Sequence, residues 1–199
     1  MILLATALLL ALAPQAKAES WTRLPTGTTE WTVKSGFPWS GASVRRSLGP
    51  RVAALAGVDA ALFRRWEAQA GLQIHWVQSP HWAMDSTLAL GVVHQTGSVS
   101  RQGPQASAVL RFSRTGNIEP YLAFHDRELI SLQSTQVLAA GGDSTEWDLT
   151  VLHARGGTLG VVFPTRKPLM LELGLQMGSV DSAFAIPSAF AAAHWRPST

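Results

Sequence analysis

The sequence predicts an all-β protein that folds as an antiparallel, up-and-down transmembrane β-barrel of about ten strands, with eight as the alternative count. Two observations support this fold class. Many segments alternate apolar and polar residues with a period of two, the period at which the side chains of a strand change faces. Short sequences rich in Gly, Pro, Ser and Thr separate these segments, as tight turns between strands do.

Residues 168–177 show the alternation most clearly. Five apolar side chains, from Leu169 to Met177, fall on one face of an extended chain, while Glu172 and Gln176 fall on the other. A membrane barrel turns such an apolar face outward to lipid, whereas a water-soluble barrel or sandwich turns it inward. The orientation of this face therefore decides what kind of protein the chain forms.

The chain divides into three parts. Residues 1–18 are predicted to be a cleaved secretory signal, because an apolar run ends in Ala16-Lys17-Ala18 with small residues at the cleavage positions. An uncleaved membrane helix is the alternative, but the run is shorter than the roughly 20 residues that a spanning helix needs. Residues 19–28 form an N-terminal extension, and residues 29–199 form a single β-barrel domain.

Composition excludes several kinds of site. The chain has no Cys, so it has no disulfide, no thiol nucleophile and no Cys-based zinc site. The net charge is only +3 and the arginines are scattered, which gives no support to nucleic-acid binding. Charged residues make up 15% of the chain, which is low for a soluble β-protein of this size.

Ten segments fit strands, most of them close to the 9–11 residues that a tilted spanning strand requires. The segment 51–59 is the least certain, because the apolar residues between Val52 and Trp66 also fit one face of a helix. Gly156-Gly157 interrupts another segment, and this interruption leaves eight strands as an alternative. The expected strands are 29–37, 40–48, 51–59, 66–78, 83–94, 106–114, 117–125, 147–163, 168–178 and 185–196.

The apolar faces of these segments are expected to face lipid. The predicted lipid-facing residues are Leu72, Leu88, Leu90, Leu110, Phe112, Leu122, Phe124, Leu169, Leu171, Leu173 and Leu175. Short turns are expected to alternate with long polar loops at Gln95–Gln105 and Glu128–Thr145, as in spanning barrels.

Tryptophans lie near the ends of the predicted strands, where membrane barrels carry aromatic girdles. Packing in an ordinary core is the alternative interpretation, since Trp is a large apolar residue in any fold. The predicted girdle consists of Trp31, Trp39, Trp66, Trp76, Trp82, Trp147 and Trp195.

The signal, the alternating strands, the alternating loop lengths and the aromatic Trp195 near the C-terminus together resemble a small outer-membrane β-barrel of Gram-negative bacteria. The resemblance covers residues 29–196 and rests on pattern, not on a motif. It implies an outer-membrane location, contact with outer-membrane lipid and recognition by the outer-membrane assembly machinery. The chain departs from the family pattern by continuing through residues 196–199 after its last aromatic residue.

The inward faces of the strands carry charges of both signs, which would pair and largely fill a narrow lumen. The expected function is a structural barrel or a narrow pore. A secreted soluble β-barrel with an apolar ligand inside is the alternative, and it would place Glu67, Gln69, Gln73, Glu172 and Gln176 on the outer surface. The predicted lumen network is Arg45, Glu67, His75, Arg111, Glu119, Tyr121 and Glu172.

No catalytic residue, metal site or cofactor is predicted. The six His residues do not form the close-spaced pair of a zinc hydrolase. A barrel lipid hydrolase is a further alternative, for which the best candidates are His125 and Asp126 with Ser131 or Ser134. No Gly-Xaa-Ser-Xaa-Gly sequence accompanies them.

Overall fold

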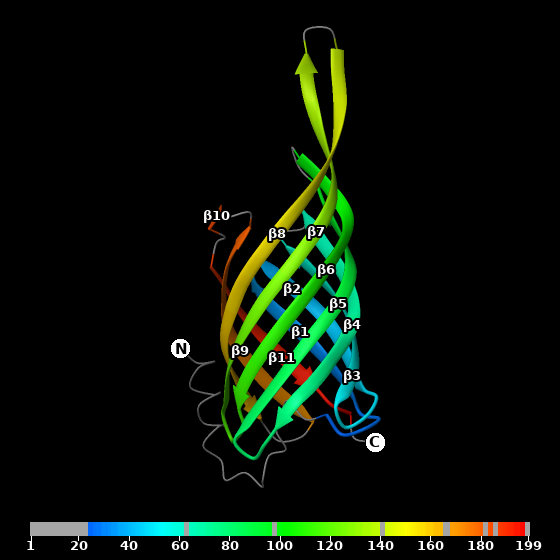
Figure 1. The fold of residues 1–199 in the computed structure, drawn as a ribbon. Helices are drawn as coiled ribbons and strands as arrows, with labels where there is room; N and C mark the ends of the chain where they lie inside the picture. Colours follow the sequence, from blue (N-terminus) through cyan, green and yellow to red (C-terminus); the bar gives the residue numbers. More distant parts are fainter. Residues whose placement is uncertain are drawn as a thin grey trace.

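The computed structural model describes residues 24–61, 64–96, 99–139, 142–164, 168–180, 183–184 and 187–197. Nearly all of these residues lie in one antiparallel sheet (Figure 1). The strands are β1 (Thr29–Phe37), β2 (Trp39–Ser47), β3 (Val52–Ala61), β4 (Arg65–Gln78), β5 (Trp82–Gln95), β6 (Val99–Arg114), β7 (Glu119–Ala139), β8 (Gly142–Pro164), β9 (Leu169–Val180), β10 (Ala183–Phe184) and β11 (Ser188–Trp195).

The sheet closes into a ten-stranded up-and-down barrel. Strands β1 to β9 pair with their sequence neighbours, β9 pairs with β11, and β11 pairs with β1 to close the ring. The two-residue β10 pairs only with the end of β9 and is not a strand of the wall. The predicted fold class and the count of ten are therefore confirmed.

Two sequence alternatives are wrong. Residues 52–61 form strand β3 and not a helix, because they pair along their whole length with β4 and, from Ala53 onward, with β2. Strand β8 runs through Gly156-Gly157 without a break, because β7 and β9 hold both of its edges at this point. The eight-strand count, which depended on an interruption there, is excluded.

The two ends of the barrel differ. One end, called here the turn end, is defined by the connections at residues 48–51, 79–81 and 115–118. The strands end at this rim of the barrel and do not extend far beyond it. At the opposite end, called here the hairpin end, β7 and β8 continue as a two-stranded ribbon far beyond their neighbours (Figure 1). The expected loops at Gln95–Gln105 and Glu128–Thr145 are therefore wrong over most of their length, since β6 begins at Val99, β7 continues to Ala139 and β8 begins at Gly142.

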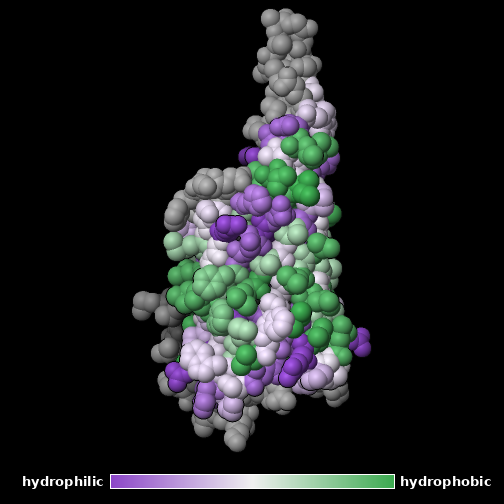
Figure 2. Space-filling model, in the orientation of Figure 1, coloured by the Kyte–Doolittle hydropathy of each residue, from purple (hydrophilic) through white to green (hydrophobic). Residues whose placement is uncertain are grey.

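The period of two separates an inner from an outer face along each strand. In β7, the odd positions from Glu119 to Ser131 are buried or half-buried, and the even positions between them are exposed. The exposed positions of the wall carry large apolar residues, which form a belt across the visible face of the barrel (Figure 2). Within the described residues there is no helix of the length and hydropathy that crossing a membrane requires.

Candidate functional site

A layer of polar side chains crosses the lumen near the turn end. Its members come from eight different strands, and each lies close to the turn-end limit of its strand. This layer, called the polar ring, consists of Glu30, Arg45, Gln73, Asp85, Arg111, Tyr121, Glu172 and His194. Its charged members are held in a narrow interior where each needs a partner.

One half of the ring is a continuous chain of hydrogen bonds from β1 to β5. Arg45 donates through Nη2 to Glu30 Oε1 at 3.0 Å and through Nη1 to Gln73 Oε1 at 2.7 Å. The amide of Gln73 then donates to Asp85 Oδ1 at 2.7 Å. Four strands are therefore linked across the lumen by three side-chain hydrogen bonds, in addition to their backbone ladders.

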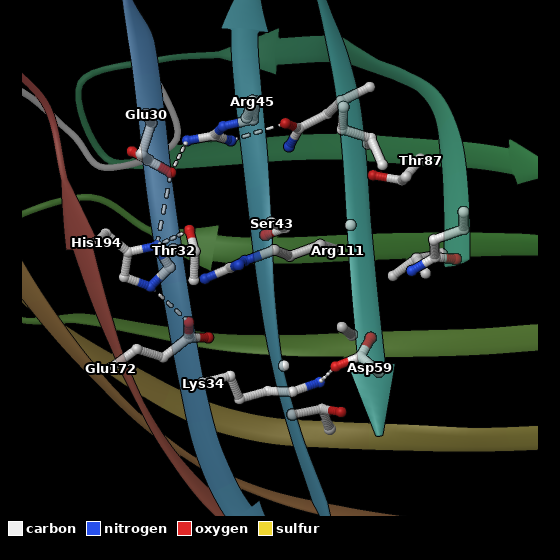
Figure 3. A pocket seen from close by; sticks show the side chains of 18 of the residues that line it. Glu30, Thr32, Lys34, Ser43, Arg45, Asp59, Thr87, Arg111, Glu172 and His194 are labelled. Carbon is white, nitrogen blue, oxygen red and sulfur yellow. Dashed lines mark hydrogen bonds and ion pairs between the residues drawn. The ribbon is translucent and has the colours of Figure 1, made fainter. Parts of the chain in front are cut away.

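The other half of the ring connects β1 to β11, β9 and β7. His194 Nε2 lies 2.8 Å from Glu172 Oε2, and His194 Nδ1 lies 2.9 Å from the hydroxyl of Thr32 and 3.5 Å from Glu30 Oε1. The side chain of Tyr121 on β7 also interacts with the Glu172 carboxylate. Figure 3 shows His194 between the two carboxylates that it joins.

Arg111 occupies the middle of the layer. Its guanidinium carbon lies 3.6 Å from the centroid of the Tyr121 ring, a cation–π arrangement. The carboxylates of Glu172 and Asp85, on opposite halves of the ring, both attract its charge. In Figure 3 its side chain extends toward His194 and Glu172. Arg111 therefore fills the space between the two hydrogen-bonded halves.

A cavity of about 320 Å³ lies against the polar ring. Its remaining wall is rich in hydroxyl and amide groups, including Thr32, Ser43 and Thr87. The ion pair between Lys34 Nζ and Asp59 Oδ1 spans 2.8 Å at one side of it. The ring forms its floor, so the cavity extends from the ring toward the hairpin end.

The predicted lumen residues all point inward, and all seven are buried. Arg45, Arg111, Tyr121 and Glu172 come together in the ring. The other three are not members of the ring, although His75 is the cross-strand neighbour of the ring residue Asp85. Glu67 lies near the hairpin end with Arg127, His75 near the turn end of β4, and Glu119 at the start of β7.

Sequence reasoning missed half of the ring: Glu30, Gln73, Asp85 and His194. The alternation of faces along a strand is the feature of the sequence that indicates an inward position for each of them. Gln73 follows Leu72, and His194 precedes Trp195, so each is the inward neighbour of a residue that was expected to point outward. The prediction rested on the outward-facing apolar residues and left out the inward-facing polar residue next to each of them.

The outer face places the predicted apolar residues on the exterior of the wall. Ten of the eleven expected lipid-facing side chains are exposed, and Leu171 is half-buried. Trp31, Trp76, Trp82 and Trp195 lie near the turn end, and Trp66, the second residue of β4, lies at the other end. The prediction is wrong for Trp39, because the first residue of β2 lies on the same face as Ser43 and Arg45, which line the lumen. The Arg65 guanidinium carbon lies 5.1 Å from the centroid of the Trp39 ring. The remaining predicted girdle residue, Trp147, lies elsewhere. It is on the β7–β8 ribbon, seven residues beyond Ala154, the last β8 residue that pairs with β9.

The hydrolase candidates do not assemble. His125 faces the lumen and forms a 2.7 Å hydrogen bond with the Thr158 hydroxyl, whereas Asp126 is exposed on the outer face. The Ser131 hydroxyl is buried and has no hydrogen-bond partner among the described residues, so none of their side chains is placed to take its proton. Among the described residues, no group of three or more His, Asp or Glu side chains is arranged to hold a metal ion.

Comparison with known proteins gives structural neighbours only. No family model matches the chain, and no curated protein matches it by sequence. The N-terminal β-barrel domain of Pseudomonas aeruginosa OprF aligns with 86% of this chain and 98% of its own length, at 11% identity and a TM-score of 0.36. Neisserial surface protein A aligns with 85% and 93% (15% identity, TM-score 0.35), and Yersinia pestis outer membrane protein Ail with 86% and 99% (9% identity, TM-score 0.38).

Proposed function

We propose that this chain is a non-enzymatic outer-membrane β-barrel whose lumen is closed by the polar ring. The observation that carries the proposal is the inverted polarity of the closed sheet. Glu30 is 2% exposed inside the barrel, while Leu90 is 72% exposed outside it. Exposing such an apolar surface to water is unfavourable, whereas the hydrocarbon of a bilayer solvates it. The closed barrel also leaves no backbone edge unpaired in the membrane.

The dimensions of the outer face support a membrane location. Trp66 and Trp76 are exposed at opposite ends of β4, ten residues apart. At about 3.3 Å per residue and a tilt of about 40°, this separation corresponds to a height of roughly 25 Å, the height of the apolar band of outer-membrane barrels. We infer that the five exposed Trp residues near the ends of the wall form the two interfacial girdles and that the leucines between them contact lipid.

The orientation follows from the two ends. Outer-membrane barrels place short turns in the periplasm and longer connections outside. The turn end would accordingly face the periplasm, and the β7–β8 ribbon would extend outside the cell. Delivery would use residues 1–18 as a secretory signal, a segment outside the described residues, and insertion would use the outer-membrane assembly machinery.

The soluble, ligand-binding alternative conflicts with the orientation of the faces. It requires Glu67, Gln73 and Glu172 on the surface, but all three are buried inside the barrel. It also requires the leucines of β9 inside, but Leu173 and Leu175 are exposed. The structural role with a closed lumen is therefore the function that the geometry supports best.

The proposal is tested by cell fractionation and by planar-bilayer recording. We expect the protein in the outer-membrane fraction, with heat-modifiable mobility on a detergent gel, and we expect no large steady conductance from the folded protein. Recovery in the soluble periplasm after gentle lysis would exclude the membrane location. A large, continuously open channel would exclude closure by the polar ring.

A further inference from the structure

The inner wall at the hairpin end carries a second set of charges, and it differs from the polar ring. We propose that Arg65, Arg101 and Arg127, called here the arginine cluster, form a binding site for a solute that carries two or more phosphate or carboxylate groups. The inference rests on the proposed function only in that this end of the lumen would open outside the cell. The binding itself needs no membrane and no conductance.

The backbone register places these arginines on one wall. Arg65 of β4 lies opposite Gln95 of β5, which lies opposite Arg101 of β6. Arg101 in turn lies opposite Gln133 of β7, six residues from Arg127. The three arginines occupy odd positions of β4, β6 and β7, and the odd positions of these strands face the lumen. Long basic side chains from three strands therefore share one part of the interior.

The cluster contains more positive charge than it neutralises internally. Arg127 Nη1 donates to both oxygens of Glu67, at 2.8 and 2.7 Å, and Arg65 Nη2 lies 3.6 Å from the same carboxylate. Arg101 donates instead to the neutral side chain of Gln133, at 3.3 Å. Within the described residues, Glu67 is the only carboxylate that pairs with the cluster.

One more carboxylate lies on the row of cross-strand neighbours that contains Arg101, but it does not neutralise the excess positive charge of the arginine cluster. Asp148 of β8 lies opposite Gln133 and is exposed. It forms no ion pair in the described part of the chain, and including it still leaves three positive charges against two negative ones. In the polar ring, by contrast, Arg45 pairs with Glu30, and Arg111 interacts with Glu172 and Asp85.

A second observation points to a ligand at the same wall. Gln105 lies four residues from Arg101 on the same face of β6 and is 4% exposed, yet among the described residues neither its amide oxygen nor its amide nitrogen has a hydrogen-bond partner. The Ser131 hydroxyl, between Arg127 and Gln133 on β7, is also buried and has no hydrogen-bond partner in the part of the chain that the structure describes. Buried polar groups in native proteins are normally satisfied, so orphaned donors beside excess cations indicate a missing acceptor.

Oxyanions fit these donors chemically. Guanidinium groups bind phosphate and carboxylate through paired N–H donors, and amide and hydroxyl donors complete such sites. Neighbouring strands are about 4.8 Å apart, so Arg65 and Arg101, two strands apart, are roughly 10 Å from each other at the backbone. This spacing favours a ligand with two or more anionic groups over a single small ion.

The test is calorimetric titration of the folded, detergent-solubilised full chain with tripolyphosphate and, separately, with citrate. Arg101→Gln removes the arginine that lacks a carboxylate partner. Arg114→Gln is the matched control, because Arg114 is an exposed arginine on the same strand at the turn end. Heat-modifiable mobility establishes that each variant is folded before titration.

We expect measurable binding of at least one probe to the unmodified chain, a loss of tenfold or more in affinity for Arg101→Gln, and no loss for Arg114→Gln. The two probes show whether phosphate or carboxylate groups are preferred. Gln105→Leu, which leaves every charge in place, should weaken binding severalfold. Failure of both probes to bind, or equal losses in Arg101→Gln and Arg114→Gln, would overturn the proposal, whatever bilayer recordings show.

Discussion

Arg196 donates its Nε–H to Glu30 Oε2 at 2.6 Å, and this contact joins the residue after the last strand to the first strand of the barrel. The same carboxylate accepts a hydrogen bond from Arg45 on the other side. The seam between β1 and β11 is thus held by side chains as well as by the backbone ladder that pairs Trp31 with Trp195.

Glu30→Ala is expected to destabilise the barrel strongly. The substitution leaves Arg45 and Arg196 buried without their shared carboxylate, and breaking a buried ion pair costs about 3–5 kcal/mol. Urea unfolding in lipid vesicles, followed by Trp fluorescence, measures the change. Asp59→Asn breaks the more accessible pair with Lys34 and should cost about 1 kcal/mol or less. Equal losses in the two variants would contradict the role of Glu30 at the seam.

Two exposed leucines should respond differently to the same substitution. Leu88→Arg places a charge in the middle of the outer apolar belt, where arginine costs about 2–4 kcal/mol in a membrane barrel. Leu149→Arg places it on the β7–β8 ribbon, beyond the part of β8 that pairs with β9, and should be nearly neutral. The free energy of unfolding in vesicles separates the two cases. If Leu88→Arg leaves the free energy of unfolding unchanged, the outer face of the wall does not contact lipid.

Gly160→Ala should disturb the polar ring, although its strand, β8, contributes no residue to that ring. Gly160 lies opposite Tyr121, and a Cβ atom there would overlap the tyrosine ring on which Arg111 stacks. Overpacking of this kind costs about 1–3 kcal/mol. Gly157→Ala on the same strand is the control, since its Cβ would meet nothing closer than the Ala123 carbonyl oxygen at 3.4 Å. Thermal unfolding in detergent should shift for Gly160→Ala alone.

Arg111→Ala should open the lumen. Arg111 fills the space between the two halves of the polar ring, and the alanine side chain leaves that space to water. We expect discrete conductance steps in planar bilayers from the variant and far smaller ones from the unmodified protein. Arg114→Ala, at the exposed end of the same strand, should leave the recording unchanged. If Arg111→Ala folds and conducts no more than the unmodified protein, another layer of side chains must close the lumen.

The wall of the barrel was largely predictable because the period of two is a local property. The expected strand 66–78 differs by one residue from β4, and the inward residues of the predicted network are all buried. The partners within the lumen were not predictable in the same way. Glu30 meets His194 and Arg196 only because the sheet closes with one particular register, and no short segment encodes that register.

The β7–β8 ribbon shows where local reasoning failed. Its sequence contains Gly, Ser, Asp and Thr, which are typical of loops, so residues 128–145 were expected to be irregular. Beyond the wall, however, a two-stranded ribbon needs only its own ladder, and the exact pairing from Glu119 to Ala139 supplies it. Polar composition there reflects exposure to water and not the absence of a strand.

The pairing of β1 with β11 has a consequence for how the barrel is made. These are the first and last strands of the wall, so each has an unsatisfied edge until the other arrives. Hydrocarbon offers no substitute for the missing backbone partners, so a partly assembled sheet is poorly tolerated within a bilayer. Entry into the membrane and sealing of the cylinder should therefore be completed as one concerted event, late in assembly, after β11 has been delivered to its site beside β1.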